Sequence, residues 1–171
     1  MRKSNKKGYY FIIDAFIGST IIFLSLLIIL NGGIKPSKIQ YNYEMAEEYS
    51  TFILNTKIQD LNNEYVNSLT TSHAINDTTL TIMEQVDLFY YNNDTSHAKF
   101  MIQNLTDPLI AQKYSFSYDV IDGAKTVNIY NRTNINTSDA KLVVASKKIT
   151  FLQINSSTLF GPVMTEIKIW I

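Results

Sequence analysis

The sequence has no cysteine, few prolines and glycines, and no excess of either charge. Without cysteine the chain forms no disulfide, has no thiol nucleophile and lacks the sulfur ligands of structural zinc sites. The 15 basic and 15 acidic residues cancel, so the net positive charge typical of nucleic-acid binding is absent. A folded domain in this chain is therefore stabilised by packing alone.

The charges are distributed unevenly along the chain. The first seven residues contain four basic side chains and no acidic one: Arg2, Lys3, Lys6 and Lys7. From Asn31 onward, 11 basic residues stand against 14 acidic ones. A basic cluster before an apolar run tends to remain on the cytoplasmic side of a membrane. The mildly acidic remainder gives no reason to expect nucleic acid as a partner.

Residues 9–30, YYFIIDAFIGSTIIFLSLLIIL, are almost entirely apolar, and Asp14 is their one acidic or basic side chain. A helix of this length reaches about 33 Å, enough to cross the hydrocarbon core of a bilayer. The sequence therefore predicts a transmembrane helix over 9–30, preceded by a basic leader over 1–8. The remainder is expected on the extracellular side of the cell membrane, with the N-terminus in the cytoplasm.

A break follows, because residues 31–37, NGGIKPS, contain two glycines and Pro36. We expect a hinge there and an extracellular α+β domain over 38–171. Apolar residues at steps of three and four predict helices over 38–69, 78–91 and 97–105, with Asp77 and Ser96 as caps of the second and third.

After Gln112 apolar residues recur at every second position and alternate with polar ones, which indicates strands. Strands are predicted over 113–121, 125–131, 141–154 and 163–171, and Asp122-Gly123 is expected to form the first turn. Helices followed by strands favour an α+β fold. The expected architecture is an N-terminal transmembrane helix, further helices, and then a four-stranded antiparallel sheet.

Six N-x-Ser/Thr triplets occur in the part of the chain that is expected outside the cell. Their asparagines are candidate glycosylation sites: Asn76, Asn93, Asn104, Asn131, Asn136 and Asn155. Loops rich in Asn and Thr also produce such triplets by accident. Together the six favour a glycosylated, surface-exposed domain.

The sequence contains no arrangement of residues typical of catalysis. His73 and His97 are its two histidines, and one His–Asp pair is too little for a metal site. Acidic residues such as Glu47 and Glu48 are typical of the solvated face of a helix. We therefore expect no enzyme, no metal and no cofactor.

The N-terminal pattern has a known counterpart. A basic leader that ends in Lys7-Gly8 and continues as YYFIIDAFIG resembles the class III signal of archaeal type IV pilin-like proteins. In those proteins the acid is usually a Glu at the fifth position after the cut, whereas Asp14 is at the sixth. The resemblance implies cleavage after Gly8 by a prepilin-type peptidase, which would make Tyr9 the new N-terminus. It also implies a helix that packs with other pilin-like subunits in a filament.

Asp14 allows two interpretations. A carboxylate in a membrane helix is costly, so it would pair with the free α-amine of Tyr9 on a neighbouring subunit and set the stagger between subunits. Alternatively, Asp14 simply reaches the cytoplasmic interface beside Tyr9 and Tyr10.

Two functions follow from these expectations. The first is a pilin-like surface protein, a subunit or minor component of a type IV pilus-like filament used for adhesion or attachment. The alternative is a permanently membrane-anchored, non-polymerising glycoprotein whose outer domain serves binding or envelope structure.

Overall fold

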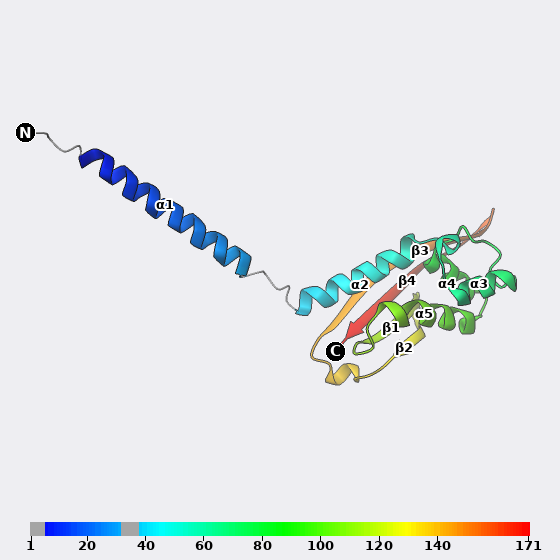
Figure 1. Cartoon of the computed structure of the whole chain (residues 1–171). Coiled ribbons are helices and arrows are strands. Elements are labelled where there is room, and N and C mark those ends of the chain that lie inside the picture. The colour runs from blue at the N-terminus through cyan, green and yellow to red at the C-terminus, as the bar shows by residue number, and fades with distance from the viewer. Residues whose placement is uncertain (1–5, 32–37) are drawn as a thin grey trace, which may run out of the picture. The chain divides into compact units, whose positions relative to one another are not determined.

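The computed structural model describes the backbone of residues 6–31 and 38–171, and the side chains of 13–27 and 41–171. The chain divides into two compact units, Met1–Pro36 and Ser37–Ile171. The first contains one helix, α1 (Lys6–Asn31), and the second contains further helices and a sheet (Figure 1). Beyond Asn31, the predicted hinge lies outside the described residues, as do residues 1–5 of the leader.

The prediction of a transmembrane helix over 9–30 is wrong. Among the described residues, no helix combines the length and the apolar character that crossing a membrane requires.

The expected helix over 38–69 is interrupted. It consists of α2 (Lys38–Asn55), a short 3-10 turn (Ile58–Asp60) and α3 (Glu64–Thr71). The break follows from contacts with a distant segment, because Ile58 N donates to Leu80 O at 2.9 Å and Ile82 N donates to Thr56 O at 2.9 Å. Backbone groups that bond across segments cannot continue a helical ladder.

The next two helices begin at caps other than those expected. Helix α4 (Ile82–Tyr91) starts with a capping box between Thr81 and Glu84. Asp77 lies in the preceding loop, where its carboxylate accepts from Thr79 N at 2.9 Å. Helix α5 (Thr95–Leu109) is capped by Asp94 and runs through Pro108. A proline in the last turn removes only one bond of the ladder, so the helix continues to Leu109.

The prediction of an α+β unit with a four-stranded antiparallel sheet is confirmed. The strands are β1 (Ser115–Asp122), β2 (Lys125–Arg132), β3 (Val143–Asn155) and β4 (Thr158–Trp170), in the order β2-β1-β4-β3. A 3-10 turn (Thr137–Asp139) lies between β2 and β3. The fourth strand begins five residues before its predicted start at 163, because β3 and β4 are joined directly by a tight turn.

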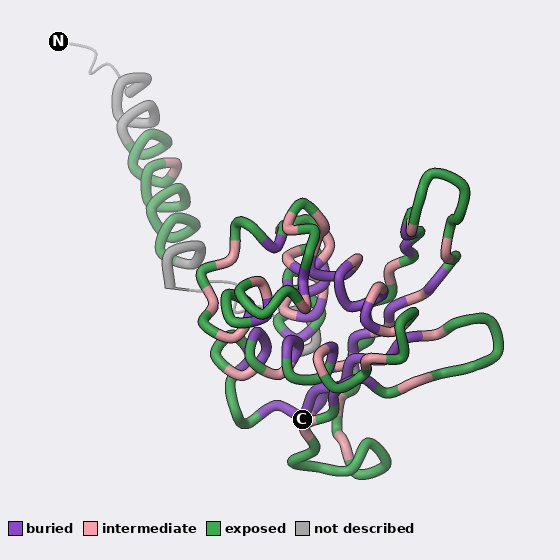
Figure 2. Tube along the Cα trace, turned by 90° about the vertical axis from the view of Figure 1, so that its right-hand side faces the viewer, coloured by how far each residue is buried: buried purple, intermediate pink, exposed green. Residues whose placement is uncertain are grey.

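The core lies between the helices and one face of the sheet, which we call the inner face. Phe116 on β1 stacks edge-on against Tyr49 of α2, with ring centroids 5.3 Å apart. On the β3–β4 side, Phe160 packs against Tyr90 and Tyr91 of α4. Buried positions concentrate where these layers meet, and the hairpin tips are exposed (Figure 2).

Candidate functional site

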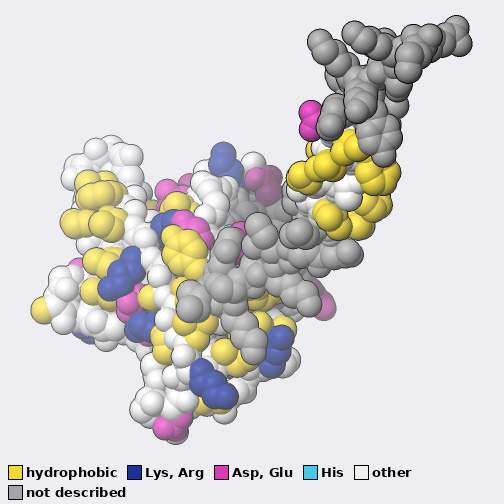
Figure 3. Space-filling model, turned by 90° about the vertical axis from the view of Figure 1, so that its left-hand side faces the viewer, with side chains coloured by type: hydrophobic (Ala, Val, Ile, Leu, Met, Phe, Trp, Pro, Cys, Tyr) yellow, Lys and Arg dark blue, Asp and Glu magenta, His cyan; other side chains and the backbone are white. Residues whose placement is uncertain are grey.

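The described part of helix α1 exposes large apolar side chains over most of its circumference. Phe16 and Ile22 are 73% and 71% exposed, and Figure 3 shows hydrophobic side chains on the visible face of the described part of the helix. The other exposed apolar residues are Ile13, Ile17, Ile21, Phe23, Leu24, Leu26 and Leu27. This surface is unusual for a soluble domain, since contiguous exposed apolar area indicates a binding surface.

The three hydroxyl groups among the described side chains of α1 are satisfied within the helix. Ser19 and Thr20 both donate to Phe16 O, at 2.9 and 2.7 Å, and Ser25 donates to Ile21 O at 2.8 Å. Side chains that bond to their own backbone can enter an apolar environment without losing a partner. The helix surface is therefore suited to packing against another apolar surface.

Asp14 lies on this helix with an exposed side chain. The predicted processing residues Lys7, Gly8 and Tyr9 fall in the first two turns of α1, and their side chains lie outside the described residues. The structure thus places the processing residues and Asp14 on one continuous helix.

The six sequon asparagines are all exposed. Asn155 lies at the turn between β3 and β4, where its side chain accepts from Ser157 N at 3.0 Å. Asn104 differs from the others because Thr106, the third residue of its sequon, is fully buried. The Thr106 hydroxyl is bonded to the Tyr49 hydroxyl at 2.7 Å. In the folded domain that hydroxyl is out of reach of a modifying enzyme.

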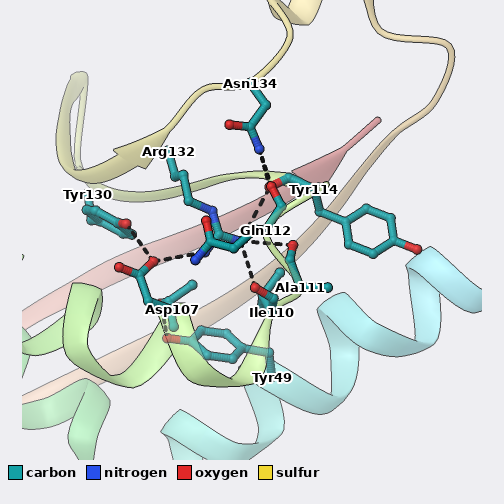
Figure 4. Close-up of polar contacts among 10 residues, drawn as sticks. Tyr49, Asp107, Ile110, Ala111, Gln112, Tyr114, Tyr130, Arg132 and Asn134 are labelled. Atoms are coloured by element: carbon teal, nitrogen blue, oxygen red, sulfur yellow. Dashed lines mark hydrogen bonds and ion pairs between the residues drawn. The ribbon is translucent and has the colours of Figure 1, made fainter.

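A polar cluster around Arg132 was not predicted. Its Nη1 donates to Asp107 Oδ1 at 2.8 Å, and its Nη2 donates to Ile110 O at 2.8 Å (Figure 4). Tyr130 donates to the same Asp107 oxygen at 2.9 Å. Burial, together with the bond to Asp107, raises the pKa of Tyr130 to about 12. These contacts fix the end of α5 against β2, so we interpret the cluster as structural.

A second polar cluster joins α2 to the inner face of β3. Glu47 accepts from Ser146 Oγ at 2.7 Å and forms an ion pair with Lys148. Hydrogen bonds from Lys148 and Ser146 lower the pKa of Glu47. Glu47 thus bonds to the sheet while its side chain remains 39% exposed, and Glu48 is exposed as expected of a solvated helix face.

A groove of about 300 Å³ opens between α2 and the end of α5. It is lined by Met45, Glu48, Tyr49, Phe52, Leu109 and Ile110. The lining is mostly apolar and contains no nucleophile beside a base, so it offers no catalytic arrangement.

The described residues contain no group of three or more His, Asp or Glu side chains that could hold a metal ion. His97 Nδ1 lies 2.5 Å from Asp94 Oδ2, beside the N-terminal cap of α5. Comparisons with known protein families, with curated proteins and with solved structures found no match to this chain. The functional argument therefore depends on the residues themselves.

Proposed function

We propose that this chain is a non-enzymatic, pilin-like subunit of a cell-surface filament that serves adhesion or attachment. One observation carries the proposal: α1 exposes large apolar side chains along its described length while Ser37–Ile171 forms a compact unit of its own. Each large side chain that leaves water for a packed bundle contributes about 1.5–3 kcal/mol. Association through α1 is therefore strongly favourable, and the helices of other copies are its natural partners.

In this proposal Asp14 fixes the axial stagger between the α1 helices of neighbouring copies. After cleavage behind Gly8 by a prepilin-type peptidase, the free α-amine of Tyr9 in one copy pairs with the Asp14 carboxylate of another. A charge pair inside an apolar bundle is costly unless both members are matched, so only one stagger between helices is stable. The α+β domain is then displayed outside the bundle, where its exposed sequons are accessible.

The test uses the full chain with Asp14→Ala, and Ser19→Ala is the matched control on the same helix. We expect filaments from the unaltered chain and from Ser19→Ala in electron microscopy, and at least tenfold fewer from Asp14→Ala. Mass spectrometry of the mature protein should find Tyr9 as the first residue.

Equal filament yields from Asp14→Ala and the control would contradict the role of Asp14. A full chain that stays monomeric in sedimentation with an intact leader would contradict the filament, and would favour a non-polymerising surface domain that serves binding.

A further inference from the structure

The face of the sheet opposite the inner face, which we call the outer face, is not covered by any helix of residues 38–171. Helices α2, α4 and α5 contact the inner face, through pairs such as Tyr49–Phe116 and Asp87–Thr150. The segment after β2 covers one end of the outer face, where Trp170 Nε1 donates to Ile135 O at 2.6 Å. Among the described residues, the outer face is most exposed toward the β3–β4 turn, whereas Ser117 and Asp119 on β1 are only 5% and 6% exposed.

This exposed part carries an apolar patch near the β3–β4 turn. Ile149, Phe151 and Leu159 are 61%, 55% and 63% exposed. Ile149 is paired with Met164, and Met164 is paired in turn with Ile121 on β1. We call Ile149, Phe151, Leu159, Met164 and Ile121 the outer patch.

A row of charges runs across the strands beside the outer patch. Lys168 Nζ lies 3.1 Å from Asp119 Oδ2 and 2.7 Å from Glu166 Oε2. Lys147 Nζ lies 3.1 Å from the other oxygen of Glu166. Two positive and two negative groups neutralise each other, and Asn128 Nδ2 also donates to Asp119 Oδ1 at 2.6 Å.

This charge balance indicates the kind of partner. A strongly acidic or basic partner gains no net attraction from a neutral row, so electrostatic steering favours neither. A surface that carries the same neutral row and the same apolar patch meets no repulsion and needs no outside counter-charge. Flat sheet faces of this kind pack on one another about 10 Å apart in β-sandwiches.

The small area of the outer patch limits the affinity with which it can bind a partner. Three side chains that expose somewhat more than half of their surface present on the order of 300 Å² of apolar area. A stable interface buries about 800 Å² per partner. The patch therefore does not hold a dimer in dilute solution, but it can pair copies whose effective concentration is already high.

We propose that the outer patch is an interface with the outer patch of a second copy of this chain, formed when α1 brings copies together. This inference rests on the proposed filament function for the high local concentration. In that arrangement, the apolar patches of two copies cover each other, and the two neutral charge rows remain at the rim.

The test exploits the lack of cysteine in the natural sequence. The full chain with Phe151→Cys is oxidised under assembly conditions, and disulfide-linked dimers are measured on a non-reducing gel. The control is Phe100→Cys, since Phe100 is 48% exposed on α5. We expect at least fivefold more dimer from Phe151→Cys, and Leu159→Cys provides a second position in the patch if Phe151→Cys folds poorly.

Electron microscopy of the same samples separates the two proposals. Filaments with equal cross-linking at patch and control positions would overturn the patch interface and leave the filament standing. Selective cross-linking at the patch without filaments would support the interface and contradict the filament. Neither filaments nor selective cross-linking would overturn both.

Discussion

Asp87 on α4 accepts a hydrogen bond from the hydroxyl of Thr150 on β3, inside the interface between the helix and the sheet. Asp87 is fully buried, and its other oxygen, Oδ1, has no hydrogen-bond partner in the described part of the chain. Burial raises the pKa of Asp87 from the usual 3.8 to about 7. The negative charge of Asp87 would also add to the effect of burial on Tyr118, whose pKa is raised well above its usual value.

A pH-dependent stability follows from Asp87. The folded chain holds the Asp87 proton more tightly than the unfolded chain, so the free energy of unfolding falls as the pH rises from about 4 to about 7. Above pH 7 both states are ionised and the contribution is constant. The loss is on the order of 4 kcal/mol at most, from 1.36 kcal/mol per pH unit.

Asp87→Asn should remove this loss, because an amide keeps a hydrogen-bond acceptor for Thr150 and carries no charge. We expect the variant to be more stable than the natural chain at pH 8 by about 1–3 kcal/mol, and nearly equal at pH 4. Urea denaturation at both pH values measures the difference. A variant that is destabilised equally at the two pH values would contradict a buried, protonated Asp87.

Arg132 should contribute strongly to stability. Its side chain is 11% exposed, pairs with Asp107, and donates to the carbonyl groups of Ile110, Ala111 and Tyr114. Arg132→Met leaves those acceptors without their donor, so we expect the free energy of unfolding to fall by about 2–4 kcal/mol. Thermal denaturation followed by circular dichroism measures the change.

The matched control is Lys147→Met, which removes an ion pair whose lysine is 55% exposed. Exposed pairs contribute about 0–1 kcal/mol, so this variant should denature close to the natural chain. Arg132→Lys should recover only part of the loss, because a single ammonium cannot reach all of the acceptors. Equal losses at Arg132 and Lys147 would show that the cluster has no special role.

The strands were largely predictable because their signal is local. Tyr118 and Val120 alternate with polar neighbours and lie buried on the inner face, and the Asp122-Gly123 turn joins β1 to β2 as expected. The interruption after Asn55 was not predictable, because its cause is a pair of backbone bonds from Ile58 and Ile82 to residues more than twenty positions away in the chain.

The residues of the candidate sites also fall into two groups: those that the sequence alone reveals and those that only the fold brings together. The apolar helix and Asp14 lie in one continuous stretch of sequence, so both could be predicted from the sequence alone. Arg132 and Asp107 come from different elements and share no motif, so only the folded chain brings them within 2.8 Å. The charge row of the outer face depends equally on strand order, since β1 and β4 are neighbours although β2 and β3 lie between them in sequence.

Sequon occupancy is a further prediction. If the chain is modified after folding, Asn155 should carry a glycan because its turn is exposed. Asn104 should not, because the hydroxyl of Thr106 is buried against Tyr49. Mass spectrometry of glycopeptides from the mature protein measures both sites. A glycan on Asn104 would indicate that modification precedes folding.

Gly161 on β4 should tolerate no side chain. Its φ is +121°, and a Cβ atom there would lie 2.9 Å from Thr150 O and 3.2 Å from Val163 N. Both neighbours are backbone atoms held in the sheet, so neither can move without loss of strand pairing. We expect Gly161→Ala to lower the free energy of unfolding by about 3 kcal/mol, measured by urea denaturation.

Gly123 provides the comparison for this prediction. Its φ is +58°, and a Cβ atom there would meet nothing within 4 Å. Gly123→Ala therefore carries only the cost of a left-handed backbone, about 1–2 kcal/mol. The additional loss at Gly161 has two sources: the close approach of Thr150 O on β3, and a φ of +121°, which lies outside the left-handed region near +60° that other residues adopt. Equal losses at the two glycines would contradict both the steric contact and the backbone strain at Gly161.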